Sequence, residues 1–501
     1  MPMSLHKNYR FTLYSLLLCA FLLQASPITV YIDDKATVPG NIQADLLQLM
    51  AAEPAATVAV IVQKYALPAD GDQVEQLVEQ LGGTITKRLS IINGLAAELP
   101  VSQLLTLARS RAVRWISLDA PVIPTACPSC IDTSNLRNIY PNLVGADRLW
   151  NEAPYRQGQG IGVAVVDSGI QFNHPDLANQ VVARTQTNLI SVGLDGFGHG
   201  SFVAGIIGGN GTASQGGFIG IAPKVNLIDV RVSTLAGLSL ESDVVAGLQW
   251  VYENRSTYNI RVVNLSLNAG AAQSYHTSAL AAACEALWFS GVVVVTAAGN
   301  SGQAALYPPA NDPYVITVGA VDDQGTLDMS DDVVASFSAY GTTTDGIAKP
   351  DLVAPGRKMV APLAQPVALL GVLHPTQVLN SSYIRMSGTS VSAPVVTGAV
   401  ALLLQDEPTL TPDQVKYRLM QTANKNWAGY DPIKAGAGYL DIYAAVQGTT
   451  TASANEGVTP SEFLSTDHTD LLILRLTNGT VNWSSVNWSS VNWSSINWGG
   501  E

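Results

Sequence analysis

Two kinds of apolar pattern alternate along the middle of this chain, from about residue 135 to residue 447. The first is a short, continuous run of apolar and largely β-branched residues, which occurs at 162–166, 225–230, 262–265, 292–296 and 315–318. Runs of this kind are typical of parallel strands that are covered on both faces. The second is a helical stripe, as at 240–251, and a capping box at 411–414 begins a further helix. The pattern predicts an α/β domain with helices around a central, mostly parallel sheet.

A shorter set of elements precedes this domain, over residues 57–119. Residues 57–62 have the composition of a strand, and 72–81 form an amphipathic helical pattern that a Gly-Gly pair ends. Two strands, a helix and a strand follow, at 84–89, 95–99, 101–108 and 113–118. This order of elements predicts a separate, small domain that contains both strands and helices.

The first 26 residues have the pattern of an export signal. Basic residues precede an apolar run at 11–23, and small residues follow at positions 25 and 26. The run is too short to span a bilayer and matches the core of a signal peptide, although an uncleaved membrane anchor is the alternative. Because no other stretch is long and apolar enough, we expect a secreted protein with no stable membrane span after signal removal.

Two further segments have biased compositions. Residues 120–134 are rich in Pro, Ser, Thr and Cys, which is typical of a linker. The tail, residues 448–501, carries the repeat Val-Asn-Trp-Ser-Ser from Val481, so that a Trp recurs every five residues. This period fits neither one face of a helix nor one face of a strand. A flexible low-complexity tail, an aromatic surface for glycans or cell wall, and glycosylation at the Asn-Trp-Ser triplets are the alternatives.

Composition narrows the class of partner. The 501 residues are 47% hydrophobic, which is enough for a large core and more than one domain. The net charge of −13 would repel phosphate backbones, so we expect no nucleic-acid partner. Cys127 and Cys130 can form a local disulfide, and ordinary thiols are the alternative. Since no second Cys or His pair accompanies them, we expect no zinc site.

Three short segments carry the residue types of a nucleophilic hydrolase. Asp167 ends a predicted strand, where its carboxylate can accept a hydrogen bond from a His and orient the ring. His199 lies between glycines at the start of an apolar helix, and its imidazole can take a proton from a hydroxyl. Ser390 begins another apolar helix, whose unpaired N–H groups favour an oxyanion. Taken alone, each would be a common strand-end or capping residue.

Two neighbouring residues extend this interpretation. Asn300 follows a predicted strand in the sequence Ala-Ala-Gly-Asn, and its amide N–H₂ could donate a hydrogen bond to an oxyanion; a turn Asn is the alternative. Pro394 falls in the expected first turn of the Ser390 helix, where its missing N–H has little cost.

The order Asp167, His199, Ser390, together with the Asn300 motif and the segment 349–356, resembles the subtilase family over about residues 57–447. The resemblance implies a subtilisin-like three-layer fold and a serine endopeptidase that acts on protein or peptide substrates through an acyl-enzyme. The resemblance also implies that the side chain of Asn300 donates a hydrogen bond to the oxyanion. A catalytically inactive homologue that acts as a binding or cell-surface protein is the alternative.

The same resemblance implies a self-processing zymogen. Residues 57–119 would be a ferredoxin-like α+β propeptide that assists folding and then inhibits the active site. Maturation cleavage would fall in the linker at 120–134 or close to it.

The family pattern also suggests how substrate is bound. The implied substrate-binding residues are Ser266, Leu267, Asn268, Gly299 and Leu306. Asn268 stands where the family usually has Gly and would narrow the groove, and Leu306 would shorten the specificity pocket and favour smaller apolar side chains. We expect no required cofactor. Structural calcium is compatible with the family, but residues 208–217 contain no carboxylate and no loop specifies a site.

Overall fold

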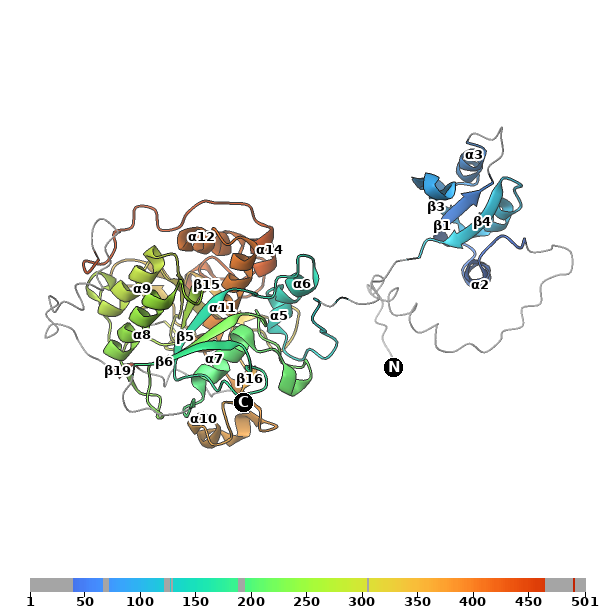
Figure 1. Ribbon diagram of the computed structural model, residues 1–501. Helices are drawn as coiled ribbons and strands as arrows, with labels where there is room; N and C mark the ends of the chain where they lie inside the picture. Colours follow the sequence, from blue (N-terminus) through green and yellow to red (C-terminus); the bar gives the residue numbers. More distant parts are fainter. Residues whose placement is uncertain are drawn as a thin grey trace, which may run out of the picture. The chain divides into compact units, whose positions relative to one another are not determined.

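The structure is a computed structural model that describes residues 39–65, 72–120, 127, 129–187, 194–303, 306–464 and 490–491. It divides into two compact units, Met1–Ala126 and Cys127–Glu501, and each is described here by itself (Figure 1). The predicted export signal lies outside the described residues, as does most of the repeat tail. The boundary between the units falls inside the segment 120–134 that the sequence indicates as a linker.

The first unit is a four-stranded antiparallel sheet with the strand order β2-β3-β1-β4. Its elements are α2 (Ala44–Ala52), β1 (Thr57–Lys64), α3 (Gln73–Gln80), β2 (Thr84–Leu89), β3 (Gly94–Pro100), α4 (Leu104–Ala108) and β4 (Val113–Leu118). From β1 onward this is the βαββαβ order of a ferredoxin-like domain. The observed bounds lie within two residues of the predicted ones, except that α4 begins three residues later than the predicted helix at 101–108, because residues 101–103 form a 3-10 turn. Helix α2, whose Leu46 is fully buried, is not predicted by the sequence pattern.

The second unit is built on an eight-stranded sheet with the order β12-β11-β10-β9-β5-β7-β6, in which β15 also pairs with β11. The strands are β5 (Gly162–Asp167), β6 (Val181–Gln186), β7 (Asn226–Arg231), β9 (Ile260–Leu265), β10 (Val293–Ala297), β11 (Ile316–Asp322), β12 (Val333–Val334) and β15 (Leu352–Pro355). All pairs are parallel except β11 with β12. The five predicted strands are β5, β7, β9, β10 and β11.

Helices cover both faces of this sheet. Figure 1 shows α8 and α9 on one side and α7 and α11 on the other, and the helices of each pair contact each other. The helices of the second unit are α5 (Tyr140–Leu143), α6 (Ala146–Asn151), α7 (His199–Gly208), α8 (Glu241–Asn254), α9 (Ala279–Phe289), α10 (Leu369–Leu373), α11 (Thr389–Asp406), α12 (Pro412–Thr422), α13 (Pro432–Ala435) and α14 (Ile442–Gln447). The predicted three-layer α/β architecture with a mostly parallel sheet is confirmed.

Helix α11 runs through the middle of the unit. By length and composition it could cross a membrane, but from Thr389 to Leu404 it is buried in the core against three central strands.

The remaining short strands are β8 (Ser239–Leu240), β13 (Gly341–Thr342), β14 (Ala348–Lys349), β16 (Met359–Pro362), β17 (Val378–Leu379), β18 (Tyr383–Met386) and β19 (Ser490–Val491).

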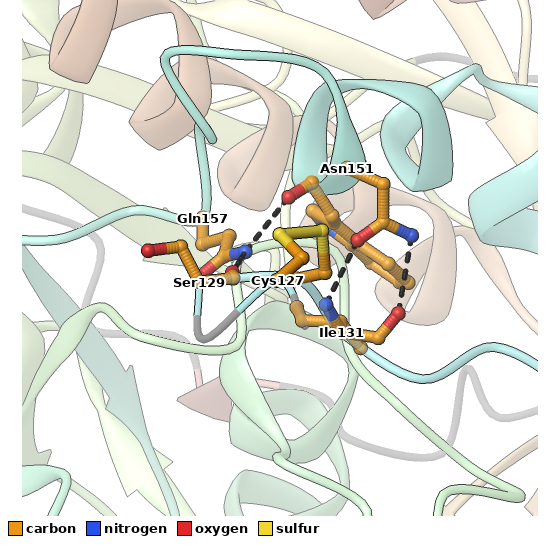
Figure 2. The surroundings of a disulfide bond; sticks show 7 residues. Cys127, Ser129, Ile131, Asn151 and Gln157 are labelled. Atoms are coloured by element: carbon orange, nitrogen blue, oxygen red, sulfur yellow. Dashed lines mark hydrogen bonds between the residues drawn. A yellow bond between two sulfur atoms is a disulfide. The ribbon is translucent and has the colours of Figure 1, made fainter. Parts of the chain in front are cut away.

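The second unit begins with a disulfide between Cys127 and Cys130, one of the two alternatives that the sequence left open (Figure 2). A hydrogen bond next to the disulfide joins the start of the unit to the segment that follows α6. The Gln157 side-chain amide donates to the carbonyl oxygen of Ser129 at 2.5 Å, as Figure 2 shows.

Residues 448–464, which the sequence assigns to the tail, lie against the second unit. The N–H of Ser461 donates to a carboxylate oxygen of the buried Glu285 at 2.8 Å. The hydroxyl of Tyr314 donates to the carbonyl oxygen of Val458 at 2.6 Å. The compact part of the unit therefore extends past α14 to about residue 464.

Candidate active site

Asp167 and His199 meet where β5 ends and α7 begins. The Nδ1 atom of His199 lies 2.8 Å and 2.9 Å from the two carboxylate oxygens of Asp167, and both side chains are buried. The N–H of Ser168 donates to Asp167 Oδ1 at 2.7 Å and helps to fix the carboxylate. Because a carboxylate can only accept, Nδ1 carries the proton and Nε2 is left as the basic nitrogen.

A glycine allows the two elements to approach so closely. A Cβ atom at Gly200 would lie 2.3 Å from the carbonyl oxygen of Gly169 and 3.1 Å from the Asp167 side chain. Any larger residue at position 200 would therefore push the start of α7, and His199 with it, away from the end of β5.

Asp195 fixes the start of α7 through hydrogen bonds to both of its side-chain oxygens. One of its oxygens accepts from the N–H of Gly198 at 2.7 Å and from Ser168 Oγ at 2.9 Å. The other accepts from the N–H and the hydroxyl of Ser201, at 2.9 Å and 2.7 Å. Burial raises the pKa of Asp195 above its ordinary value, and these hydrogen bonds oppose that rise. Sequence reasoning did not single out this residue, although an Asp shortly before an apolar helix is an N-cap signal.

Ser390 is the second residue of α11. Its hydroxyl is buried and has no hydrogen-bond partner among the residues that the structure describes. Because it lies in the first turn, its backbone N–H has no partner within the helix and can bind an anion. A carbonyl group placed here would lie next to both the helix N-terminus and the Ser390 hydroxyl.

The position of Pro394 differs from the prediction. Helix α11 begins at Thr389, so Pro394 is its sixth residue and lies beyond the first turn. A residue there would normally donate its N–H to the carbonyl of Ser390, four residues earlier, and proline cannot. The hydroxyl of Ser266 supplies the missing donor, at 2.8 Å from the Ser390 carbonyl oxygen.

Asn300 is oriented by the residue next to Ser390. Its side-chain oxygen accepts from the N–H of Thr389 at 2.8 Å and from the Thr389 hydroxyl at 3.0 Å. The Thr389 hydroxyl in turn accepts from the N–H of Gly299 at 3.0 Å. Two donors on one side fix which end of the amide faces Thr389. The buried Nδ2 atom is left with no partner within the described part of the chain, so it can donate to a ligand.

The proposed substrate-binding residues fall into two groups. Ser266, Leu267 and Asn268 follow β9, and Asn268 Nδ2 donates to the Ala297 carbonyl oxygen at 3.0 Å, so this side chain ties β9 to β10. The backbone of Gly299 lies beside the Asn268 side chain.

Leu306 lies in a different environment from the segment after β9. It is 2% exposed and packs in a small apolar cluster with Ala298, Ala310 and Ala339. The structure therefore brings Asp167 directly to His199, and Asn300 to Ser390 through Thr389. Among the described residues, no group of three His, Cys, Asp or Glu side chains is arranged to hold a metal ion.

Comparisons with known proteins agree with this geometry. The family model described as the Subtilase family matches residues 158–454. Serine protease AprX of Bacillus subtilis (strain 168) is 34% identical over 375 residues, which cover 71% of this chain and 84% of that protein. Subtilisin DY of Bacillus licheniformis is 32% identical over 309 residues, which cover 61% and 97%.

Two further likenesses extend over more of the chain. The extracellular serine proteinase of Thermus sp. (strain Rt41A) is 32% identical over 388 residues, covering 76% of this chain and 83% of that protein. The crystal structure of fervidolysin from Fervidobacterium pennivorans, a keratinolytic enzyme related to subtilisin, matches with a TM-score of 0.50 and 24% identity. That match covers 79% of this chain and 61% of the fervidolysin chain, and it supports the fold alone.

Proposed function

Because the chain belongs to the subtilase family of serine endopeptidases, we propose that Ser390 is its nucleophile, His199 its general base and acid, and Asp167 the residue that orients His199. The observation that carries this assignment is the anchoring of Asn300 on Thr389, the residue before Ser390, which leaves the Asn300 N–H₂ group without a partner among the described residues. An inactive homologue would have no reason to keep a buried donor without a partner, because such a group is costly.

The chemistry is acyl transfer. Nε2 of His199 takes the proton from the Ser390 hydroxyl as Oγ attacks the peptide carbonyl carbon. The resulting oxyanion accepts hydrogen bonds from Asn300 Nδ2 and from the backbone N–H of Ser390. His199 then protonates the leaving amine, and a water molecule, deprotonated by the same nitrogen, hydrolyses the acyl-enzyme. Asp167 stabilises the imidazolium that forms in each step and holds the ring in place.

The substrate lies along the segment Ser266–Asn268 and against Gly299. Leu306, which packs in one cluster with Ala298, bounds the pocket for the side chain before the cleaved bond and favours small apolar side chains. Ser266 has a second task in the same place, since it supports the carbonyl of Ser390.

The enzyme is made as a secreted, self-processing zymogen. Support comes from the ferredoxin-like order of the first unit, from the unit boundary after Ala126 and from the disulfide at Cys127, which suits an oxidising compartment. A relative is itself named as extracellular. Residues 57–119 act as the inhibitor, and the zymogen cleaves itself within 120–134 or close to it.

The test compares hydrolysis of a chromogenic peptide by the full chain and by two variants. Ser390→Ala should abolish turnover, whereas Ser392→Ala, which removes another buried hydroxyl two residues along the same helix, should retain it. Turnover that survives in Ser390→Ala, or that is absent from the correctly folded wild type, would refute the proposal.

A further inference from the structure

The repeat tail contacts the catalytic unit at one place that the structure describes. Ser490 and Val491, as β19, pair antiparallel with Leu240 and Ser239 of β8 (Figure 1). Within the described ranges, β8 pairs with no other strand, and the two form a separate two-stranded sheet. The backbone of β8 is thus an open edge, which is the kind of surface to which an extended peptide adds as a further strand.

Exposed aliphatic side chains occur in β8, in the segment just before it and in the segment 365–372, which lines the same hollow as Leu235. Leu235, Leu238 and Leu240 are exposed by 49%, 60% and 50%, and Val367 and Val372 by 74% and 58%. Clusters of exposed aliphatic side chains of this kind mark sites that bind another apolar group.

A hollow of about 610 Å³ opens within this surface. It is lined mainly by aliphatic side chains, among them Leu194, Leu235, Val367, Leu369 and Val372, and none of the described residues that line it is charged. An aromatic side chain is therefore a suitable occupant, since it buries a large apolar area at small cost in side-chain entropy.

The hollow and β8 both adjoin the segment that carries His199. The backbone at Gly237, two residues before β8, lies against the ring of Phe197, since a Cβ there would be 2.7 Å from it. The Phe197 ring centroid lies 6.5 Å from that of His199. On the other side, the N–H of Leu369 donates to the carbonyl oxygen of Gly196 at 2.9 Å. A peptide strand bound on β8 would therefore lie one side chain away from the proposed general base.

We propose that the Val-Asn-Trp-Ser-Ser repeats, residues 481–498, are an intramolecular ligand of this surface: the backbone adds to β8 and a repeat Trp enters the hollow. The repeats carry no charged residue, and the Val, Ile and Trp residues among their Ser and Asn residues favour strands. Trp488 and Trp493 flank the paired residues Ser490 and Val491 in sequence. Glycan binding, in contrast, would require the same Trp side chains to be free.

The length of the chain permits this contact. The residues from Leu464 to Ser490 can extend over roughly 85 Å, while a folded unit of this size has a radius of gyration of about 21 Å. A covalent connection of this length holds the tail at an effective concentration of the order of 1 mM, so even weak pairing keeps the edge occupied much of the time. Four copies of the repeat raise the occupancy further.

The functional consequence rests on the proposed peptidase mechanism. A tail bound beside His199 competes with protein substrates for the approach to the site. Replacing the four repeat Trp residues by Ser in the active enzyme should lower KM for a long peptide severalfold and leave kcat unchanged. A one-residue ester substrate, too short to reach β8, should show no change.

The pairing itself is tested by cross-linking in the full chain with Ser390→Ala, a substitution that blocks autolysis under the proposed mechanism. The rate of cross-linking reports the contact and not catalysis, so failure of this test and failure of the catalytic assignment are distinguishable. Leu240→Cys combined with Ser490→Cys should form a disulfide under mild oxidation about tenfold faster than Leu327→Cys combined with Ser490→Cys. Leu327 is a matched control because it is exposed by 61% and the same tail can reach it. Both variants share the remaining cysteines, which are Cys19, the Cys127–Cys130 disulfide and the buried Cys284, so these give an equal background.

Two results would overturn the proposal. One is equal rates of cross-linking at Leu240→Cys and Leu327→Cys. The other is a fast rate at Leu240→Cys that persists when the four repeat Trp residues are replaced by Ser, because it would show that the Trp side chains do not bind. Loss of the selective rate in that variant, with unchanged thermal unfolding, supports the proposal.

Discussion

Ser266 offers a test of how the nucleophile's helix is supported. Its hydroxyl donates to the Ser390 carbonyl oxygen at 2.8 Å, in place of the N–H that Pro394 lacks. Ser266→Ala leaves this buried carbonyl without its donor, which costs about 1–3 kcal/mol. It also removes the acceptor for Asn264 Nδ2, at 2.9 Å, so the single variant does not isolate one interaction.

A double-mutant cycle with Pro394→Ala isolates it. Alanine at position 394 restores an N–H four residues after Ser390, so the carbonyl is paired whether or not Ser266 is present. We expect Ser266→Ala to cost about 1 kcal/mol less in the Pro394→Ala background, while the loss at Asn264 is the same in both and cancels.

The assay is urea unfolding of the second unit in the Ser390→Ala protein, which removes autolysis and leaves the Ser390 carbonyl in place. In the active enzyme, KM of Ser266→Ala should change little, because the hydroxyl is engaged with α11. An equal cost of Ser266→Ala in both backgrounds would refute the reasoning.

Three other perturbations give distinct outcomes. Asn300→Ala removes the proposed oxyanion donor and should lower kcat by a factor of about 10²–10³ with KM nearly unchanged. Steady-state rates of peptide hydrolysis measure both constants, and an effect mainly on KM would contradict the assignment. Burial, reinforced by the nearby Asp312, raises the pKa of Glu285 to about 10. The folded protein therefore keeps a proton that the unfolded chain releases above the ordinary pKa of Glu. The free energy of unfolding consequently falls as the pH rises above that ordinary pKa. Glu285→Gln should therefore lose less melting temperature between pH 6 and pH 9 than the wild type, and an equal loss would contradict the shift. N-terminal sequencing should place the start of the mature wild type within or close to residues 120–134 and find the same segment uncut in Ser390→Ala; cutting in both would exclude self-processing.

The central sheet could be predicted because its strands are buried on both faces. Runs such as those of β5 and β9 have no polar alternation and leave few other interpretations. Strand β6 (Val181–Gln186) was missed because it lies at the edge of the sheet and alternates between buried and exposed residues over a short length. Helix α2 was missed because it begins without a capping side chain.

The supporting contacts of the site could not be predicted, because they join distant segments. Ser266 and Ser390 are 124 residues apart, and nothing in the local pattern shows that one replaces the N–H missing near the other. Thr389 and Asn300 are 89 residues apart, so the direction in which the amide points became clear only in the structure. The sequence motifs indicated the proposed reacting groups, whereas the orientation of those groups depends on these long-range hydrogen bonds.

The most direct test of the proposed site is labelling with a fluorophosphonate, followed by mass mapping of the adduct. The reagent forms a covalent bond only with a serine that is activated by a base and supported by oxyanion donors. We expect one adduct, on Ser390, which is lost in Ser390→Ala and strongly slowed in His199→Ala and Asn300→Ala. An adduct on another serine, or none on the correctly processed enzyme, would contradict the account.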